Sequence, residues 1–340
     1  MRNNRLSRHA VGSARQLDVP PCFPIAIAGC VCDYLRRMSS VQEPQVDVII
    51  PAYNAAKYLP AAIESVIAQT FKNWTIILVD DGCTDNTEDV VAPFLARLGD
   101  RLKYIKQPNG GVSAARNAAL RNSSAEFLAL LDADDIWLPT RLEESVRCLR
   151  AKPNVGLTYG FNTRIDPDGA VLDTFDRRQK HGEGWIAPYL YMRTIDLPSP
   201  TITFRRKCTE DVGGFDETLT VTEDRDLWLR IALRYEIALI PKVLAYYRTS
   251  PQSATTDPNR MLKSQLQFIE KHYGAPGCGM LARRAALGRI YKQRAEAFGI
   301  RRQMRDAVAS ALRAVTLYPF DVSNIRTAGS LLLRSFSFSR

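Results

Sequence analysis

Histidines and closely paired cysteines are scarce in this chain of 340 residues. It has three histidines, which lie far apart, and seven cysteines without a C-x-x-C pair. Structural zinc sites and disulfide frameworks need such residues at short, repeated spacings. Neither kind of site is therefore expected, and a reducing compartment is the simpler setting for the protein.

The sequence also lacks a long apolar run. A run near the N-terminus, residues 22–32, has eleven residues and contains a proline. A membrane-spanning helix needs about 20 apolar residues, so this run is too short to cross a bilayer. It does not end in the small-residue cleavage site of a signal peptide either. We expect residues 1–43 to be a poorly ordered basic segment, with Met38 as a candidate start of the natural chain, and the protein to be cytoplasmic.

Positive charge is concentrated at the two ends. Residues 1–42 contain six arginines against two aspartates, residues 260–340 contain fifteen basic residues against four acidic ones, and the region between them has a net charge of −5. An acidic centre argues against a nucleic-acid groove through the protein. The basic ends are candidates for peripheral contact with an anionic membrane at the inner face of the cell membrane. A basic, solvated helical face explains the C-terminal charge equally well.

Strands and helices alternate along the middle of the chain. Apolar runs at residues 46–50 and 75–79 predict buried strands, and each precedes a helical pattern, at residues 59–69 and 84–98. This order predicts an α/β, Rossmann-like sheet that is mixed, mostly parallel and flanked by helices. Neither strand is followed by G-x-G-x-x-G or G-x-x-x-x-G-K-[ST], so pyrophosphate would be held by a metal rather than by a glycine cradle.

Three aspartates follow another apolar run. Residues 127–131 predict a strand buried on both faces, and Asp132, Asp134 and Asp135 come directly after it. Ligands bind at the carboxyl ends of strands in open α/β sheets, and clustered carboxylates suit Mg²⁺ or Mn²⁺. For this motif alone, an acidic, solvated turn that caps the next helix is the competing interpretation.

Two further segments place charge at the start of predicted helices. A Gly-Gly pair at residue 110 lets the backbone approach a ligand, and Arg116 follows one turn inside a helix, where it can reach an anion. Glu223 and Asp224 begin a later helix. A helix dipole stabilises acids at that position, so helix capping alone also explains the second pair.

Four segments together carry a resemblance to a known family. They are Val48-Ile-Ile-Pro-Ala-Tyr-Asn54, Leu78-Val-Asp-Asp-Gly82, Asn109-Gly-Gly-Val-Ser-Ala-Ala-Arg-Asn117 and Leu131-Asp-Ala-Asp-Asp135. In this order and spacing they resemble the family-2 glycosyltransferases of the GT-A fold, over roughly residues 46–255. The resemblance implies a nucleotide-diphosphate sugar as donor and a divalent cation, Mn²⁺ or Mg²⁺, as cofactor.

The resemblance also implies roles for individual residues. The donor would be bound by Pro51, Tyr53, Asn54, Asp80, Asp81, Arg116 and Asp132. Asp134, together with Asp132, would hold the cation. The acceptor side would include Gly213, Gly214 and Trp228, and Asp224 would be the general base with Glu223 orienting it.

The chemistry of transfer explains these residue types. The diphosphate leaving group needs positive charge, whereas the attacking hydroxyl needs one carboxylate base, and a single base without a second nucleophile indicates inversion. One departure from the family pattern is Ser250, which stands where many members have a histidine. Arg248 and water are the candidates to replace its contact.

Beyond residue 258 the composition shifts to Ala, Leu, Arg and Gln with helical spacing. A helix is predicted at residues 137–149 within the first domain, and antiparallel helices are predicted from 261 onward. We therefore expect three parts, which are residues 1–43, a GT-A catalytic domain at 44–258 and a helical C-terminal extension at 259–340. The extension would pack against the catalytic domain, or dock on a membrane or partner.

The preferred function is an inverting, metal-dependent transferase that moves a sugar to a saccharide or lipid-linked hydroxyl in polysaccharide biosynthesis for the cell envelope. A nucleotidyltransferase of similar fold is one alternative, but it would usually carry a glycine-rich, basic loop where this chain has Pro51-Ala-Tyr-Asn54. A catalytically silent carbohydrate-binding or scaffold protein is another. It would not need Asp132, Asp134 and Asp224.

Overall fold

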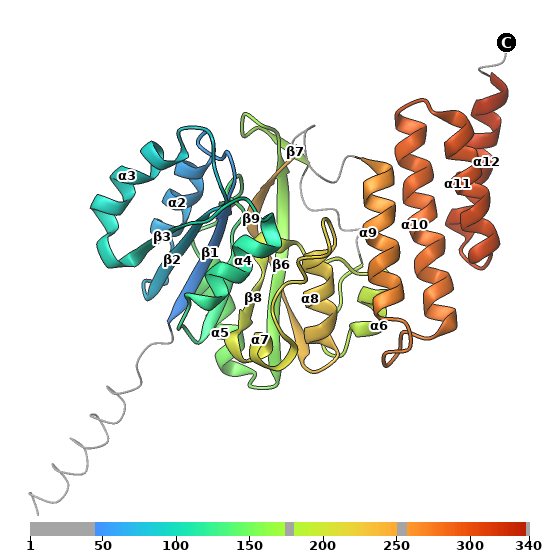
Figure 1. The fold of residues 1–340 in the computed structure, drawn as a ribbon. Helices are drawn as coiled ribbons and strands as arrows, with labels where there is room; N and C mark the ends of the chain where they lie inside the picture. The colour runs from blue at the N-terminus through green and yellow to red at the C-terminus, as the bar shows by residue number, and fades with distance from the viewer. Residues whose placement is uncertain (1–44, 174–179, 250–256, 338–340) are drawn as a thin grey trace, which may run out of the picture. The chain divides into compact units, whose positions relative to one another are not determined.

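The computed structural model describes residues 45–173, 180–249 and 257–337 (Figure 1). Side chains are described as far as residue 333. Residues 44–340 form a single unit. The predictions made for the segment 1–43, for Met38 and for Ser250 lie outside the described residues.

A single sheet passes through the centre of the first domain. Its strands follow the order β3-β2-β1-β4-β8-β6-β9-β5, and β7 pairs with β6. β1 to β4 pair in parallel, β6 and β9 are parallel, and β8 is antiparallel to both of its neighbours. The strands are β1 (Val46–Ala52), β2 (Trp74–Asp80), β3 (Leu102–Lys106), β4 (Phe127–Leu130), β5 (Ile136–Trp137), β6 (Val155–Ile165), β7 (Val171–Asp173), β8 (Thr203–Arg205) and β9 (Glu236–Arg248). The predicted mixed, mostly parallel sheet is confirmed.

Helices cover both faces of this sheet (Figure 1). They are α2 (Leu59–Ile67), α3 (Thr87–Leu98), α4 (Val112–Arg121), α5 (Arg141–Ala151), α6 (Ala187–Tyr191), α7 (Arg206–Val212) and α8 (Glu223–Ala232), with short 3-10 turns η1 (Gly99–Arg101) and η2 (Ser199–Thr201). On β1, Ile49 packs in the core with α4 and α8, whereas Val48 and Ile50 pack in the core with α2 and α5. Burial on both faces explains why the central strands are continuous apolar runs.

The helix predicted from residue 137 begins later than expected. Ile136–Trp137 forms β5 instead, paired with β9, and α5 starts at Arg141. The indole of Trp137 donates to the Pro200 carbonyl (2.7 Å), which fixes this residue in an extended conformation. Pro139 follows, and a residue before a proline is disfavoured in a helix. The prediction of a helix start at Trp137 was therefore wrong.

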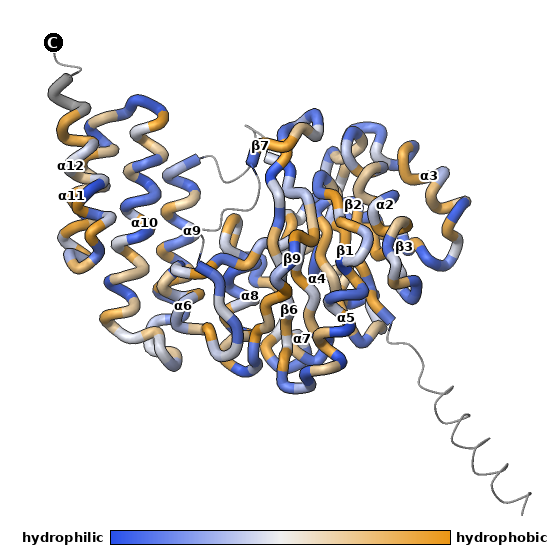
Figure 2. The backbone as a smooth tube through the Cα atoms, turned by 180° about the vertical axis from the view of Figure 1, so that it is seen from behind, coloured by the Kyte–Doolittle hydropathy of each residue, from blue (hydrophilic) through white to orange (hydrophobic). Residues whose placement is uncertain are grey.

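The C-terminal extension consists of α9 (Pro258–Lys271), α10 (Met280–Ile300), α11 (Met304–Leu317) and α12 (Val322–Ser337). Phe268 of α9 and Leu287 of α10 belong to the hydrophobic core that also contains α8. Farther out, α10, α11 and α12 pack around Phe298 and Leu331. Along these helices hydrophobic and hydrophilic residues alternate, whereas the central strands are mostly hydrophobic (Figure 2). Within the described ranges, every helix is too short or too polar to cross a membrane.

Candidate active site

The carboxyl ends of β1, β2 and β4 meet at one edge of the sheet, where the residues predicted to bind the donor lie. Pro51 belongs to β1, and the ring of Tyr53 just beyond it is 56% exposed. Asn54 has a positive φ of 49°, a conformation that asparagine tolerates. Its side-chain carbonyl accepts hydrogen bonds from the Thr84 N–H (2.8 Å) and hydroxyl (3.2 Å). Asn54 thus joins two loops, while Tyr53 stays free to meet a ligand.

Asp80 ends β2 with an ionised carboxylate held by neighbouring donors. It accepts hydrogen bonds from the Cys83 N–H (2.7 Å) and the Tyr104 hydroxyl (2.5 Å). Burial raises its pKa, but these hydrogen bonds outweigh burial and leave the pKa below its ordinary value. Next to it, Gly82 has a φ of 77°, and a Cβ there would lie 2.8 Å from the Asn109 nitrogen. Only glycine allows the loops after β2 and β3 to approach this closely.

Asp81 shapes the glycine loop that precedes α4. Its carboxylate accepts hydrogen bonds from the N–H groups of Gly110 (2.9 Å) and Gly111 (2.8 Å) and from the Gln107 amide (2.7 Å). The residue is only 3% exposed. These three hydrogen bonds show that Asp81 positions the loop, and its predicted contact with the donor stays a prediction.

Arg116 on α4 joins two acidic motifs that are far apart in sequence. Its Nη2 donates to Asp132 Oδ1 (2.7 Å) and its Nη1 to Glu223 Oε1 (3.1 Å), and its side chain is 4% exposed. Burial lowers the pKa of Arg116, but the charges of Asp132 and then Glu223 raise it above its ordinary value. Arg116 therefore fixes the end of β4 against the start of α8, and its charge is already matched by protein carboxylates.

Asp134 and Asp135 lie in a buried turn after β4. Asp135 is fully buried, its Oδ1 accepts a hydrogen bond from the Arg248 N–H (2.8 Å), and its Oδ2 has no partner among the described residues. Burial, and then the charge of Asp132, raises the pKa of Asp134 to about 6. The turn thus concentrates more negative charge than the neighbouring protein groups compensate.

The donor set of this turn fits a divalent cation. Asp132 and Asp134 offer hard oxygen ligands, and a cation would relieve the repulsion that raises the pKa of Asp134. In the described part of the chain, no group of three or more His, Cys, Asp or Glu residues could by itself hold a metal. Magnesium-type sites often use one or two carboxylates and take their other ligands from substrate phosphates and water. The two aspartates are consistent with such a site.

Arg248 braces the acidic turn. Its guanidinium donates to the carbonyls of Asp134 (2.9 Å), Asp166 (2.9 Å) and Pro167 (3.0 Å). These bonds use Nε and Nη1 of Arg248. The role considered for Arg248 at the diphosphate stays a prediction.

The acids at the start of α8 have different surroundings. Glu223 is 8% exposed, and burial, followed by the charge of Asp224, raises its pKa to about 7. Asp224 is less buried, and its carboxylate accepts hydrogen bonds from the Ser199 hydroxyl (2.9 Å) and the Arg225 N–H (2.5 Å). Both acids line the same cleft. Glu223 accepts a hydrogen bond from Arg116, whereas the Ser199 hydroxyl orients Asp224.

This cleft has a volume of about 850 Å³. Arg116, Asp132 and the two acids of α8 line one part of it, and Met261 of α9 and Arg294 of α10 line another. Sequence reasoning missed Ser199 and the whole α9–α10 wall. The only signal for that wall was the helical spacing beyond residue 258, which does not say which face is turned to a site.

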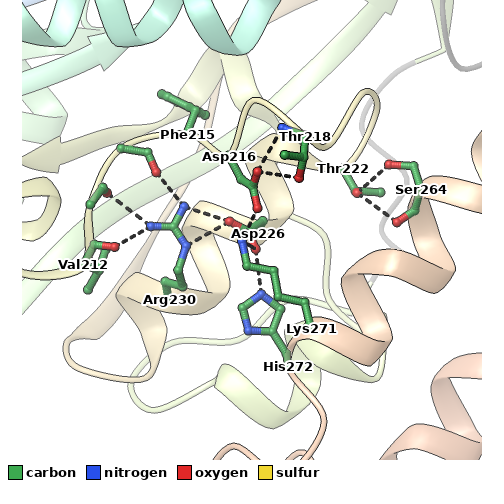
Figure 3. A network of polar contacts seen from close by, with 12 residues as sticks. Val212, Phe215, Asp216, Thr218, Thr222, Asp226, Arg230, Ser264, Lys271 and His272 are labelled. Carbon is green, nitrogen blue, oxygen red and sulfur yellow. Dashed lines mark hydrogen bonds and ion pairs between the residues drawn. The ribbon is translucent and has the colours of Figure 1, made fainter.

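A network of buried charges anchors α8 to the extension (Figure 3). Asp226 is fully buried, and its carboxylate binds Arg230 Nε (2.8 Å), Lys271 Nζ (2.8 Å) and His272 Nε2 (2.7 Å). Arg230 also donates to the Gly214 carbonyl (2.7 Å). Lys271 and His272 lie at the end of α9. The helix that carries Glu223 and Asp224 is therefore held in place by residues of the extension.

The residues predicted on the acceptor side shape the protein interior instead. Trp228 is 2% exposed, and its ring packs against Phe215 in the hydrophobic core, so the prediction that it meets an acceptor was wrong. Gly213 has a φ of 82°, and a Cβ on Gly214 would lie 2.5 Å from Asn117 Oδ1. The two glycines make a tight turn against α4 and, in the described structure, are not among the residues that line the cleft.

The sheet order, the acidic turn after β4 and the acids of α8 define the class of sugar-nucleotide-dependent transferases with a GT-A fold. The model for glycosyl transferase family 2 matches residues 47–208. The chain is 30% identical over 227 residues to UDP-Glc:alpha-D-GlcNAc-diphosphoundecaprenol beta-1,3-glucosyltransferase WfgD of Escherichia coli, a match that covers 66% of this chain and 85% of WfgD. The chain belongs to glycosyl transferase family 2.

Other relatives differ more in length or in sequence. An uncharacterized glycosyltransferase of Rickettsia prowazekii is 31% identical over 198 residues, which cover 56% of this chain but only 59% of that protein. The mannosyltransferase PcManGT from Pyrobaculum calidifontis, solved in complex with GDP-Man and Mn²⁺, has a TM-score of 0.59 at 19% identity and covers 90% of this chain and 88% of its own. This likeness confirms the GT-A fold.

Proposed function

We propose that the protein transfers a sugar from a nucleotide-diphosphate donor to an acceptor hydroxyl, with inversion at the anomeric carbon and with the help of a divalent cation. One observation carries the proposal: Asp132 at the end of β4 and Glu223-Asp224 at the start of α8 line the same cleft and are joined through Arg116. Such a reaction needs charge neutralisation at the leaving group and a base at the attacking hydroxyl. The cleft offers residues for both tasks.

On the donor side, the exposed ring of Tyr53 and the carboxylate of Asp80 are available to the nucleoside. Asp132 and Asp134 would hold Mn²⁺ or Mg²⁺, which when bound supplies positive charge that offsets the charge of the diphosphate leaving group. Arg116 holds the Asp132 carboxylate in place through a hydrogen bond. The Gly110 loop, held open by Asp81, allows the backbone to approach the donor.

On the acceptor side, Asp224 takes the proton of the attacking hydroxyl. As the new carbon–oxygen bond forms, the bond to the diphosphate breaks, and the nucleoside diphosphate leaves with the electron pair. The Ser199 hydroxyl and the Arg225 N–H orient the base. Glu223 stays paired with Arg116 and holds this end of α8 in position. Attack by the acceptor itself, from the face opposite the diphosphate, gives inversion.

A panel of nucleotide sugars tests donor binding directly. A donor that binds the folded protein raises its melting temperature by mass action, so we expect at least one UDP- or GDP-sugar to raise it in the presence of Mn²⁺. Release of the nucleoside diphosphate in a transfer assay then identifies the acceptor. If no nucleotide sugar of the panel raises the melting temperature and none releases a nucleoside diphosphate, the proposed activity is contradicted.

Asp134→Asn should abolish the Mn²⁺-dependent part of that shift. Without ligand, the melting temperature should not fall, because a carboxylate whose pKa is raised by burial costs the folded state stability at neutral pH and the amide removes that charge. Asp168→Asn, in an exposed turn, is the matched control and should behave as the parent protein. If Asp134→Asn keeps the full Mn²⁺-dependent shift, the cation is held elsewhere.

The acceptor that we propose is a saccharide or lipid-linked hydroxyl in surface polysaccharide assembly, by analogy with the diphosphoundecaprenol acceptor in the name of WfgD. A lipid-linked acceptor would bring the enzyme to a membrane, and residues 260–340 carry the excess of basic side chains that an anionic surface attracts.

Binding to anionic vesicles should therefore depend on salt. We expect the protein to sediment with them at about 0.05 M salt and to be released at about 0.5 M, because the Debye length shrinks to a few ångströms. Replacing the exposed Arg305 and Arg326 by glutamate should weaken binding, and neutral vesicles serve as the control. Equal sedimentation at both salt concentrations, or none at either, would argue against this role.

A further inference from the structure

One wall of the cleft carries more guanidinium groups than carboxylates. The guanidinium groups of Arg193, Arg225 and Arg294 line it, together with the carboxylates of Asp196 and Asp224. Asp196 pairs with Arg225 (2.9 Å). Among the described residues, no carboxylate lies within ion-pair distance of Arg193 or Arg294. A wall of this kind attracts an anion that the protein itself does not supply.

The other arginines of the cleft show the contrast. Arg116 is matched by two carboxylates, and Arg164 pairs with Asp173 (2.8 Å). In these ion pairs, carboxylates of the protein neutralise the charge of each arginine. The unmatched charge is therefore confined to the wall formed by the segment before η2, the start of α8 and the middle of α10.

Arg193 occupies a constrained position at this wall. Its φ of 57° is unusual for a residue other than glycine, and its Nη2 donates to Gln293 Oε1 of α10 (2.9 Å). Its Nε and Nη1 have no partner among the described residues. Burial, and then the nearby charge of Arg225, lowers its pKa to about 9. Strained backbone and unmet donors at one residue are typical of a ligand site.

Arg294 reaches the same wall from the extension. Its Nη1 donates to the Ser310 hydroxyl (3.1 Å) and its Nη2 to Asn259 Oδ1 (3.1 Å), and both partners are neutral. Its Nε has no partner within the described ranges. These contacts orient the guanidinium while leaving its charge uncompensated. The extension thus supplies a positioned cation to the cleft of the catalytic domain.

We propose that Arg193, Arg225 and Arg294 form a subsite for a phosphate group of the acceptor. The inference rests on the proposed transferase function and adds a substrate class to it, namely acceptors whose sugar carries a phosphate or diphosphate ester. Arginine suits this task because its planar donors match phosphate oxygens and it stays charged when partly buried. With the phosphate on this wall, a hydroxyl of the attached sugar lies in the same cleft as Asp224.

Binding of hexyl diphosphate tests the subsite without knowledge of the sugar. It is measured by calorimetry with UDP or GDP and Mn²⁺ filling the donor site, and again without nucleotide. We expect hexyl diphosphate to bind in both cases and uncharged hexyl glucoside to bind much more weakly. Hexyl phosphate and inorganic pyrophosphate distinguish the source of the anion: stronger binding of the alkyl esters indicates a lipid-linked acceptor, and equal binding of pyrophosphate indicates recognition of phosphate alone.

Substitutions at the wall give the decisive comparison. Arg193→Gln and Arg294→Gln should each weaken hexyl diphosphate about tenfold or more, the usual effect of losing one charge-assisted contact. Arg193→Lys should retain part of the affinity, and Arg326→Gln on exposed α12 should retain all of it. Melting curves identify any variant that fails to fold.

Two results would overturn the subsite. One is a parent protein that does not bind hexyl diphosphate, and the other is equal binding by the parent and by both folded glutamine variants. In either case, normal nucleotide-sugar binding would leave the transferase function standing. Loss of nucleotide-sugar binding in the parent protein would instead contradict the transferase function itself.

Discussion

We expect Asp224→Asn to lower kcat by roughly two to four orders of magnitude while leaving the affinity for the donor nearly unchanged. The amide has the same size and still accepts a hydrogen bond from the Ser199 hydroxyl, so the start of α8 keeps its shape. It cannot take the proton of the attacking hydroxyl. Steady-state kinetics with separate KM values for donor and acceptor measure the effect.

Two comparisons make this result specific. Glu210→Gln removes an exposed acid of α7 and should leave turnover unchanged. Glu223→Gln keeps size but weakens the pairing with Arg116, so we expect turnover to fall, whereas the melting temperature should change little because burial raises the pKa of Glu223 to about 7. Near-normal turnover of Asp224→Asn would indicate that Glu223 is the base. Loss of donor binding would indicate that Asp224 lies on the donor side of the cleft.

The positions of the acids that follow β2 and β4 could be predicted because they depend on local sequence. Asp80, Asp132 and Asp134 directly follow buried apolar strands, and parallel strands bring their carboxyl ends to one edge. The order of strands and acids in the sequence is therefore enough to predict that these acids lie close together. The pairing of Arg116 with Asp132 was missed, because Arg116 was predicted to contact an anion of the donor.

The residues on the other side of the cleft could not be predicted in this way. Ser199 begins the short turn η2 and Arg193 lies in the turn after α6, and their positions depend on packing against α8 and α10. Trp228 shows the opposite error, because an aromatic residue near an acidic motif matches a sugar-binding pattern but here fills the core. Asp81 shows a third case, in which the carboxylate of a predicted ligand motif accepts hydrogen bonds from the backbone of a loop. Sequence identifies such residues without showing which way they face.

Asp226→Asn should destabilise the protein by roughly 2–4 kcal/mol and lower the melting temperature by about 5–10 °C at neutral pH. The substitution removes the charge that pairs with Arg230 and Lys271, leaves those two cations facing a neutral amide, and changes the hydrogen bond with His272. Because Lys271 and His272 belong to the end of α9, contacts between the extension and α8 should loosen first. Hydrogen exchange of α8 and α9 at neutral pH measures this loosening directly.

The effect of Asp226→Asn should also depend on pH in a defined direction. Burial raises the pKa of Asp226, but the hydrogen bond from His272 and the charges of Arg230 and Lys271 outweigh it, so the folded-state pKa lies well below its unfolded value of about 4. The stabilisation is therefore complete above about pH 4 and is lost as the pH falls through the folded-state pKa. The difference in melting temperature between the parent and Asp226→Asn should be constant from pH 7 to about pH 5 and narrow at lower pH.

Asp216→Asn is the matched control: Asp216 also pairs with Lys271, its side chain is 22% exposed, and its loss should cost less than about 1 kcal/mol. Equal losses for the two variants, or a difference that widens in acid, would show that Asp226 is not the ionised centre of the network that holds α8 on α9.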